Sequence, residues 1–355
     1  MTGFLQVVIF VVYRYQTFFG WYVLLFLSGV WRLLVMVRGV NWFVGVLLLL
    51  MCNSNIWAWG CSSAEIEAGS STVGCLNVNG VDRHYRLFVP HKYQVVGRPL
   101  PLLIGLHGGA DNPKSFERYS QFSTLSEKTA EFIAVYPKGV NKHWNDGRAN
   151  VGAGVDDVAF LRALVKHLKR DLKLPVAPKK IFITGISNGG LMAMRVACEH
   201  PRWIAGIAVV AASETKQLSR KCSSRLLPMA AVFVFGDQDT AFLPSGLIVN
   251  PVKQKQLRGK HIGIDQTVSH WVKANHCGQF NRSRPINAVA ADQTTVVKRT
   301  YQSCKKPVVY FKVKGGGHRW ADSTASNGRL IRKMLNMGYA SQEINAAEEI
   351  WSVFR

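Results

Sequence analysis

A serine flanked by glycines constrains the fold of this chain more than any other feature. The pentapeptide Gly185–Gly189 has Ser187 at its centre, with an apolar run at 181–184 before it and a helix-like stretch at 191–197 after it. A strand, a sharp turn and a helix around Gly-x-Ser-x-Gly form a nucleophile elbow, in which glycines let helix and strand pack closely. The pattern predicts a reactive serine at a strand end. The alternative is a glycine-rich turn with an idle serine.

Two later apolar runs end in candidate partners for this serine. The run at 229–235 is followed by Asp237 and Asp239, and the run at 308–313 is followed by glycines and His318. Each residue alone could be an ordinary turn or loop residue. Their order is that of hydrolases built on an elbow, and strand ends are where open α/β sheets bind ligands. The order therefore predicts a Ser-His-Asp triad.

The chemistry of a serine nucleophile explains these residue types. A hydroxyl needs a base that titrates near working pH, and His318 supplies one for Ser187. The base needs an acceptor on its other nitrogen. We expect Asp239 in that role, because it lies three residues past Gly236 and leaves the loop room to turn. Asp237 is the alternative.

An earlier strand end offers donors for an oxyanion. The apolar run at 102–106 leads into His107 and two glycines, a turn that follows an early strand in these folds. We expect the main-chain N–H groups of Asn188 and Gly109 to hold the tetrahedral intermediate, with either neighbour of Gly109 as an alternative. His107 is expected to brace the loop rather than to react.

Several blocks of sequence carry a family resemblance. In chain order they are Leu106-His-Gly-Gly109, Val135-Tyr-Pro-Lys-Gly139, Trp144-Asn-Asp-Gly-Arg148, Gly185-Ile-Ser-Asn-Gly-Gly190 and Gly316-Gly-His-Arg-Trp320. Together they resemble the polyhydroxybutyrate depolymerase and feruloyl esterase family, from about Cys75 to the C-terminus. The resemblance implies an α/β-hydrolase fold, secreted esterase activity and a triad of Ser187, Asp239 and His318.

The chain departs from the family pattern beside the acid and after the base. Asp237 is an additional acid, and Ala321 and Asp322 follow Trp320 where the family has proline and glycine. Substrate preference is therefore not carried over. Hydroxyalkanoate oligomers, hydroxycinnamate esters and acetylated polysaccharide all stay open as substrates. We expect Trp320 and Trp144 to line the ester pocket, with ordinary partial burial as the alternative.

Cysteine usage indicates an oxidising compartment. Four of the seven cysteines, Cys198, Cys222, Cys277 and Cys304, lie well inside the hydrolase region, and these four permit three pairings. The family pattern implies the pairs Cys198–Cys222 and Cys277–Cys304, while Cys52, Cys61 and Cys75 stay unassigned. Disulfides persist outside the reducing cytosol. The alternative is four reduced cysteines packed as small apolar groups.

The N-terminal region predicts export. Residues 1–60 carry three arginines and neither acid nor lysine. The uncharged run at 15–31 is at the short limit for a spanning helix, and the run at 43–51 has the length of a signal-peptide core. A small-x-small site at 58–60 favours a cleaved signal, ahead of an uncleaved anchor and of a lipoprotein. The protein would then be extracellular or periplasmic, and possible association with a membrane stays open.

The remaining chain predicts one catalytic domain. A Ser-, Ala- and Gly-rich linker at 61–74 leads to residues 75–355. There, apolar strands alternate with amphipathic helices, which indicates a mostly parallel sheet covered on both faces. The expected strands are 84–90, 132–136, 181–184, 206–211, 229–235 and 308–313, and the expected helices are 157–172, 190–200, 264–275 and 344–354.

The net charge and the lack of cofactor motifs limit the classes of partner that we expect for this chain. The formal net charge is +23, with basic clusters at 166–170, 216–225 and 253–260. Such a field attracts anionic surfaces or acidic polysaccharide. No nucleic-acid module accompanies it, so we expect no nucleic-acid partner. No zinc spacing or phosphate loop occurs, so we expect neither a metal nor another cofactor.

The sequence thus predicts an exported serine esterase that works through an acyl-enzyme. An envelope-lipid acyltransferase and a serine peptidase would use the same triad on the same fold. An idle binding protein is a further alternative, against which the complete triad argues.

Overall fold

The computed structural model describes most of the chain. The described residues are 21–27, 30–36, 65–149, 151–222, 224–242, 261–278, 280–286, 292–321 and 338–355. The chain divides into two compact units, Met1–Trp59 and Gly60–Arg355. Among the described residues, no helix has both the length and the apolar character needed to cross a membrane.

The first unit contains a β-hairpin. Strand β1 (Trp21–Leu27) pairs antiparallel with β2 (Val30–Met36). The second apolar run of the predicted export signal and its cleavage site lie outside the described residues. The export signal or anchor expected for residues 1–60 therefore stays a prediction.

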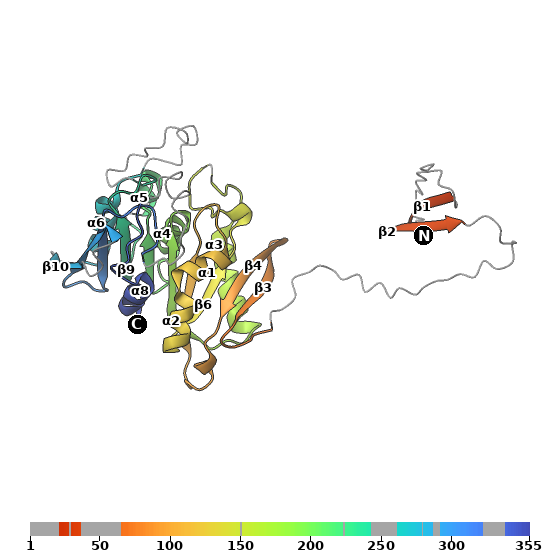
Figure 1. Cartoon of the computed structure of the whole chain (residues 1–355), viewed down its shortest axis with the longest axis horizontal. Coiled ribbons are helices and arrows are strands. Elements are labelled where there is room, and N and C mark those ends of the chain that lie inside the picture. The colour runs from red at the N-terminus through yellow and green to blue at the C-terminus, as the bar shows by residue number, and fades with distance from the viewer. Residues whose placement is uncertain are drawn as a thin grey trace. The chain divides into compact units, whose positions relative to one another are not determined.

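The second unit is built on a ten-stranded sheet (Figure 1). Its strands are β3 (Ser71–Val78), β4 (Val81–Phe88), β5 (Leu100–Leu106), β6 (Ile133–Pro137), β7 (Val176–Ile186), β8 (Gly206–Val210), β9 (Ala230–Gly236), β10 (Phe280–Ile286), β11 (Thr295–Tyr301) and β12 (Val308–Lys314). Their order across the sheet is β10-β11-β12-β9-β8-β7-β5-β6-β4-β3. The six strands from β12 to β6 run parallel, whereas the pairs at both edges are antiparallel. The predicted α/β-hydrolase class, with its mostly parallel sheet, is confirmed.

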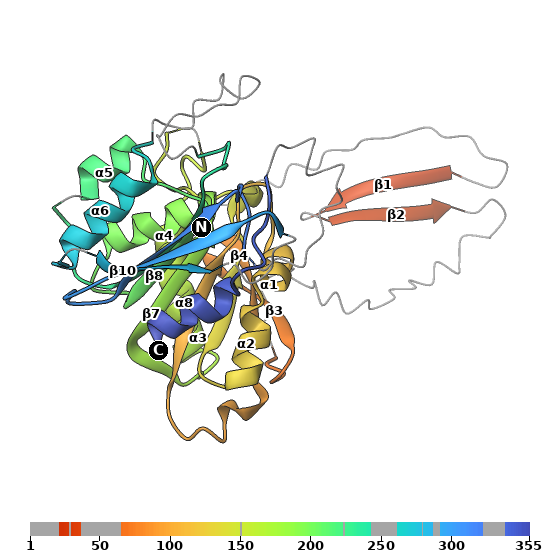
Figure 2. The same ribbon diagram turned by 60° about the vertical axis from the view of Figure 1, so that its left-hand side comes forward.

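Helices cover both faces of the sheet (Figures 1 and 2). The α-helices are α1 (Pro113–Ser120), α2 (Phe122–Thr129), α3 (Asp157–Arg170), α4 (Asn188–Glu199), α5 (Lys216–Cys222), α6 (Ile264–Ala274) and α8 (Ala346–Phe354), with short 3-10 turns at His91–Tyr93 and Val140–Lys142. Buried side chains of α3, α4 and α6 form one core cluster with the sheet. Those of α1, α2 and α8 form a second cluster. The central strands are buried on both faces, which is why they read as continuous apolar runs.

Local signals explain where the helices begin. The Asp156 side chain accepts the N–H of Ala159 at 2.9 Å and caps α3. Asn112 and Asn345 cap α1 and α8 in the same way. Helix α4 begins without a side-chain cap, directly after Ser187. Its position is set instead by the turn that follows β7.

Candidate active site

Ser187 occupies a strained turn between β7 and α4. Its φ is 56° and its ψ is −120°, a conformation rare for a residue with a side chain. Its N–H donates to the carbonyl of Val210 at 2.9 Å. A Cβ on Gly185 would overlap the main chain of Gly189, and a Cβ on Gly189 would overlap the carbonyl of Leu106. The two glycines therefore allow the close packing that a nucleophile elbow needs.

Asp239 and His318 form a hydrogen-bonded pair past the ends of β9 and β12. His318 Nδ1 lies 2.8 Å from Asp239 Oδ2. The Asp239 side chain is fully buried, and its other oxygen accepts the N–H groups of Ala241 at 2.8 Å and Phe242 at 2.9 Å. The Phe242 ring stacks on the imidazole, with centroids 5.6 Å apart. Among the described contacts, those with Asp239 and Phe242 fix the orientation of the imidazole ring through Nδ1 and one ring face.

Asp237 has a different task. Its Oδ1 accepts the N–H of Gly315 at 2.8 Å, and its own N–H donates to the carbonyl of Val313 at 3.0 Å. A Cβ on Gly236 would overlap the main chain of Gly316, so the loops after β9 and β12 pass in contact. Asp237 therefore fixes the turn that leads to the histidine, while its neighbour two residues on binds the ring.

The serine and the histidine follow strands of the same parallel set. The carboxyl ends of β7, β9 and β12 meet at one edge of the sheet. Within the described residues, Ser187 Oγ makes no hydrogen bond to His318 Nε2. In free enzymes such contacts are commonly long and close when substrate binds.

The candidates for the oxyanion donors are the main-chain N–H groups of Asn188 and of residues 108–110. Asn188 is the first residue of α4, so its N–H has no partner within the helix. The N–H of Ala110 donates to the carbonyl of Lys142 at 2.9 Å and is therefore committed. A Cβ built on Gly109 would lie 3.7 Å from the Cβ of Asn188. Of the candidates for the second donor, Gly109 and Gly108 remain.

The Asn188 side chain is bound by the loop at 144–148. Its Oδ1 accepts the N–H of Trp144 at 2.7 Å, and its Nδ2 donates to the Trp144 carbonyl at 2.9 Å and to Asp146 Oδ2 at 2.5 Å. Arg148 forms a paired contact with Asp146, with Nε 2.9 and 3.0 Å from the two carboxylate oxygens. All four residues are buried.

Both tryptophans predicted to line the pocket lie in packed surroundings. Trp144 has no exposed surface, and its indole N–H donates to the carbonyl of His107 at 2.9 Å. Trp320 is 3% exposed and packs edge-on against Phe116 and Phe122. The expectation that these rings face substrate is therefore corrected. Trp144 braces a loop, and Trp320 belongs to the core under α1 and α2.

His107 braces the turn at 107–110 that follows β5. Its Nε2 accepts the N–H of Gly139 at 3.1 Å, which fixes the tautomer so that Nδ1 donates to the carbonyl of Gly108 at 2.7 Å. Burial lowers the pKa of His107, and its hydrogen bond to Gly108 offsets only part of this. The ring is therefore held neutral inside the loop.

His143 is a residue that sequence reasoning missed. Its Nδ1 lies 2.9 Å from the carbonyl of Asn141. Its Cδ2 and Nε2 lie 3.2 Å from the position that a Cβ on Gly109 would take. The partly buried ring thus borders the turn at 107–110. Its one signal is its place directly before Trp144, at the start of a block that resembles the family.

Two disulfides tie the second unit together. Cys198, at the end of α4, bonds to Cys222 at the end of α5. Cys277, after α6, bonds to Cys304 between β11 and β12. Both are the pairs that the resemblance implies. They close loops of 24 and 27 residues, and each such loop stabilises the fold by about 3 kcal/mol in the chain-entropy model. Cys75 is also disulfide-bonded.

Several known proteins are similar to this chain in sequence. A family model described as "Putative esterase" matches residues 77–330. "Putative esterase NocK" of Nocardia uniformis subsp. tsuyamanensis is 29% identical over 260 residues, which cover 70% of this chain and 73% of that protein. "Probable feruloyl esterase C" of Aspergillus clavatus is 27% identical over 249 residues, covering 68% of this chain and 78% of that protein.

A shorter match has the other name that the sequence resemblance suggested. "Poly(3-hydroxyalkanoate) depolymerase C" of Paucimonas lemoignei is 27% identical over 122 residues, covering 33% of this chain and 28% of that protein. The matches to the esterases are longer, and they span the elbow and the acid.

Proposed function

The chain belongs to this family of esterases, as its sequence blocks predicted, and we propose that it is an exported serine esterase with the triad Ser187, His318 and Asp239. Family membership makes it a carboxylic ester hydrolase. The single observation that carries the triad is the buried Asp239–His318 pair at 2.8 Å, set at the same sheet edge as the strained serine.

The proposed reaction has two halves. Ser187 Oγ attacks the ester carbonyl while His318 Nε2 takes the hydroxyl proton, and Asp239 stabilises the imidazolium that forms. The proton passes to the leaving alcohol, which departs and leaves an acyl-serine. Water then attacks the acyl-serine with His318 again as base, and the acid is released. The N–H groups of Asn188 and Gly109 stabilise the oxyanion in both halves.

Hydroxycinnamate esters of polysaccharide are the first substrates to test. The name of the relative from Aspergillus clavatus supports this choice, because its match covers 78% of that protein. Acetyl esters and hydroxyalkanoate oligomers complete the panel. His143, whose ring borders the proposed donor Gly109, is a candidate to contact the ester's substituents.

Two features support export. The disulfides Cys198–Cys222 and Cys277–Cys304 fit an oxidising compartment. Residues 1–60 have the composition of an export signal or anchor. We therefore place the mature enzyme outside the cytoplasm.

Removal of the proposed nucleophile tests the function directly. Ser187→Ala should lower turnover of p-nitrophenyl butyrate by at least about 10³-fold, with circular dichroism and Tm unchanged. Ser352→Ala, on the exposed side of α8, is the matched control and should keep full activity. Retained activity in Ser187→Ala would remove the proposal. An acyltransferase would instead transfer the acyl group to added alcohol in preference to water, and a peptidase would cleave the corresponding anilide.

A basic stripe on α3 supports association with anionic surfaces. Arg162, Lys166, Lys169 and Arg170 are exposed, lie within one face of the helix, and form no ion pair within the described part of the chain. Protein bound to polygalacturonate should be released by about 0.5 M salt, because exposed charges are screened there. The double variant Lys166→Gln with Lys169→Gln should weaken binding to polygalacturonate more than the removal of two positive charges from α5. Retention of the protein at that salt concentration would exclude this electrostatic association.

A further inference from the structure

We propose that Asp146 is a positioning residue that fixes the main-chain N–H of Asn188, and that the loop at 144–148 holds both oxyanion donors as one unit. This inference rests on the proposed function, because the donors that the loop positions are those of the proposed reaction. Its evidence is a set of buried contacts between segments 42 to 44 residues apart in sequence.

The Asn188 side chain has no freedom left. Its amide oxygen accepts from the Trp144 N–H, and its two amide protons go to the Trp144 carbonyl and to Asp146. An amide offers two donors, and both are used. A flipped amide would place N–H against N–H and carbonyl against carbonyl, so only one orientation satisfies these partners. The first residue of α4 is therefore fixed through its side chain as well as through the helix.

The carboxylate of Asp146 accepts the Asn188 hydrogen bond in a buried position, and burial of a charge costs free energy. The carboxylate is fully buried, and Arg148, which binds it, has a side chain 4% exposed. A buried ion pair is commonly no more stabilising than apolar residues of the same volume, and a role in specifying conformation is the best-supported reason to keep one. Here the conformation that it specifies is the contact with Asn188. Arg148 holds the carboxylate, and the carboxylate holds the amide.

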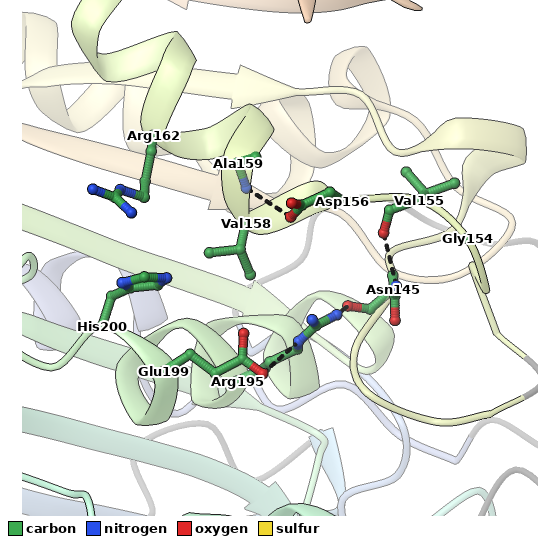
Figure 3. Close-up of a pocket in the computed structure, with 10 residues that line it drawn as sticks. All are labelled: Asn145, Gly154, Val155, Asp156, Val158, Ala159, Arg162, Arg195, Glu199 and His200. Atoms are coloured by element: carbon green, nitrogen blue, oxygen red, sulfur yellow. Dashed lines mark hydrogen bonds and ion pairs between the residues drawn. The ribbon is translucent and has the colours of Figure 1, made fainter. Parts of the chain in front are cut away.

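The loop at 144–148 also contacts α4 at a second point, through the main chain of Asn145. Arg195 Nη1 donates to the carbonyl of Asn145 at 2.5 Å, and its Nε pairs with Glu199 at 3.1 Å (Figure 3). Asn145 also donates from its side chain to the carbonyl of Val155 at 2.7 Å. Because Asn188 and Arg195 are seven residues apart on α4, the loop is fixed to the helix at two points about 10 Å apart.

The second donor is coupled to the first through Trp144. The indole N–H of Trp144 donates to the carbonyl of His107, which lies two residues before Gly109. The main chain of the same residue pairs with Asn188. One residue thus contacts both segments that supply the proposed donors. Distortion of the loop should therefore weaken both hydrogen bonds to an oxyanion.

The expected effect is a loss of transition-state stabilisation without loss of substrate binding. Removal of one oxyanion donor costs about 10²–10³ in kcat in a well-studied protease. Misplacement of a donor that is still present should cost less. We expect Asn188→Ala, which keeps the N–H but removes all three side-chain contacts, to lower kcat by about 10- to 100-fold.

The experiment compares kcat with the affinity for a transition-state analogue. Asn188→Ala should change KM for p-nitrophenyl butyrate by less than about 3-fold, and its affinity for a boronic acid should fall by the same factor as kcat/KM. Active enzyme is counted by fluorophosphonate titration, so that unfolded protein does not enter kcat. Asn275→Ala is the matched control, because Asn275 is a buried amide that caps α6 at the carbonyl of Trp271. The control should lose stability but not kcat.

A second variant tests Asp146 itself. Asp146→Leu with Arg148→Met removes the acceptor of Asn188 Nδ2 together with the buried charge pair, which spares the protein an unpaired buried charge. We expect kcat between those of Asn188→Ala and the unmodified enzyme, with the same parallel loss of boronate affinity. A variant with kcat and boronate affinity within 2-fold of the unmodified enzyme would overturn the inference, and so would a loss of kcat without a loss of affinity.

Failure of this inference is distinguishable from failure of the proposed function. If Ser187→Ala stays active, the triad is wrong and the role of Asn188 falls with it. If Ser187→Ala is inactive while Asn188→Ala has normal kcat and boronate affinity, the triad stands and only the positioning role is lost.

Discussion

The two sides of the site are held by different kinds of contact. On the side of β5 and β7, the residues around Ser187 are fixed by a buried network that runs from Asn188 through Trp144 and Asp146. On the side of β9 and β12, the described contacts of His318 are a hydrogen bond to the Asp239 carboxylate and stacking on the Phe242 ring. In the proposed reaction, the first side presents fixed dipoles to a developing charge, whereas the second takes up and returns a proton.

This difference follows from the chemistry that each side would perform. An oxyanion hole works by preorganisation, because donors already in place need no reorganisation as charge develops. A general base needs a defined tautomer and access to two partners, the serine and the leaving group. The hydrogen bond from Nδ1 to Asp239 defines the tautomer and leaves Nε2 for the serine and the leaving group. It also makes the base side depend on one residue, Asp239.

The largest effect that would sharpen this comparison is expected at Asp239. Asp239→Asn should lower kcat by about 10³- to 10⁴-fold with little change in Tm, because an amide can hold the ring but favours the wrong tautomer. Asp237→Asn is the matched control on the same loop. It keeps an acceptor for the Gly315 N–H, so activity should stay within about 3-fold. Steady-state kinetics with p-nitrophenyl butyrate measures both.

The reverse result would reassign the base side. If Asp237→Asn were the inactive variant, His318 would turn to the other carboxylate when substrate binds. Asp237, the additional acid that departs from the family pattern, would then take part in the mechanism rather than only brace a turn.

Much of this arrangement could be predicted from the sequence. Buried parallel strands read as short apolar runs, so β5, β7, β9 and β12 were recognisable with their carboxyl ends. The order of Ser187, Asp239 and His318 past those ends is what predicts the triad, which stays a prediction. The polar edge strand β10 and the eight-residue helices α1 and α2 were not expected, because their patterns are short and mixed.

The contacts that position the site could not be predicted. The three hydrogen bonds of Asn188 join segments that only the fold brings together, and nothing in the local sequence marks their partners. For the same reason Trp144 and Trp320 were expected at the pocket. A tryptophan near a motif has the same sequence signal whether it faces substrate or the core.

The smallest predicted effect concerns two histidines with opposite linkage to pH. Burial lowers the pKa of His107, on the nucleophile side. Its contribution is therefore complete above the unfolded value of 6.5 and is lost as pH falls below it. A hydrogen bond to Glu214 raises the pKa of His270, which lies on α6 beside the strands of the base side. Its contribution is complete below 6.5 and is lost as pH rises through the folded pKa.

Urea unfolding across pH 5 to 9 should therefore show a separate slope on each side of neutrality. One group contributes at most about 1.4 kcal/mol per pH unit. His270→Gln should flatten the alkaline slope and leave the acid slope, because the amide still donates to Glu214 but does not titrate. His107→Gln should do the opposite, since only the neutral ring accepts the Gly139 N–H. If His107→Gln flattened the alkaline slope instead, His107 would be charged in the fold, and the nucleophile side would not be the preorganised neutral scaffold described above.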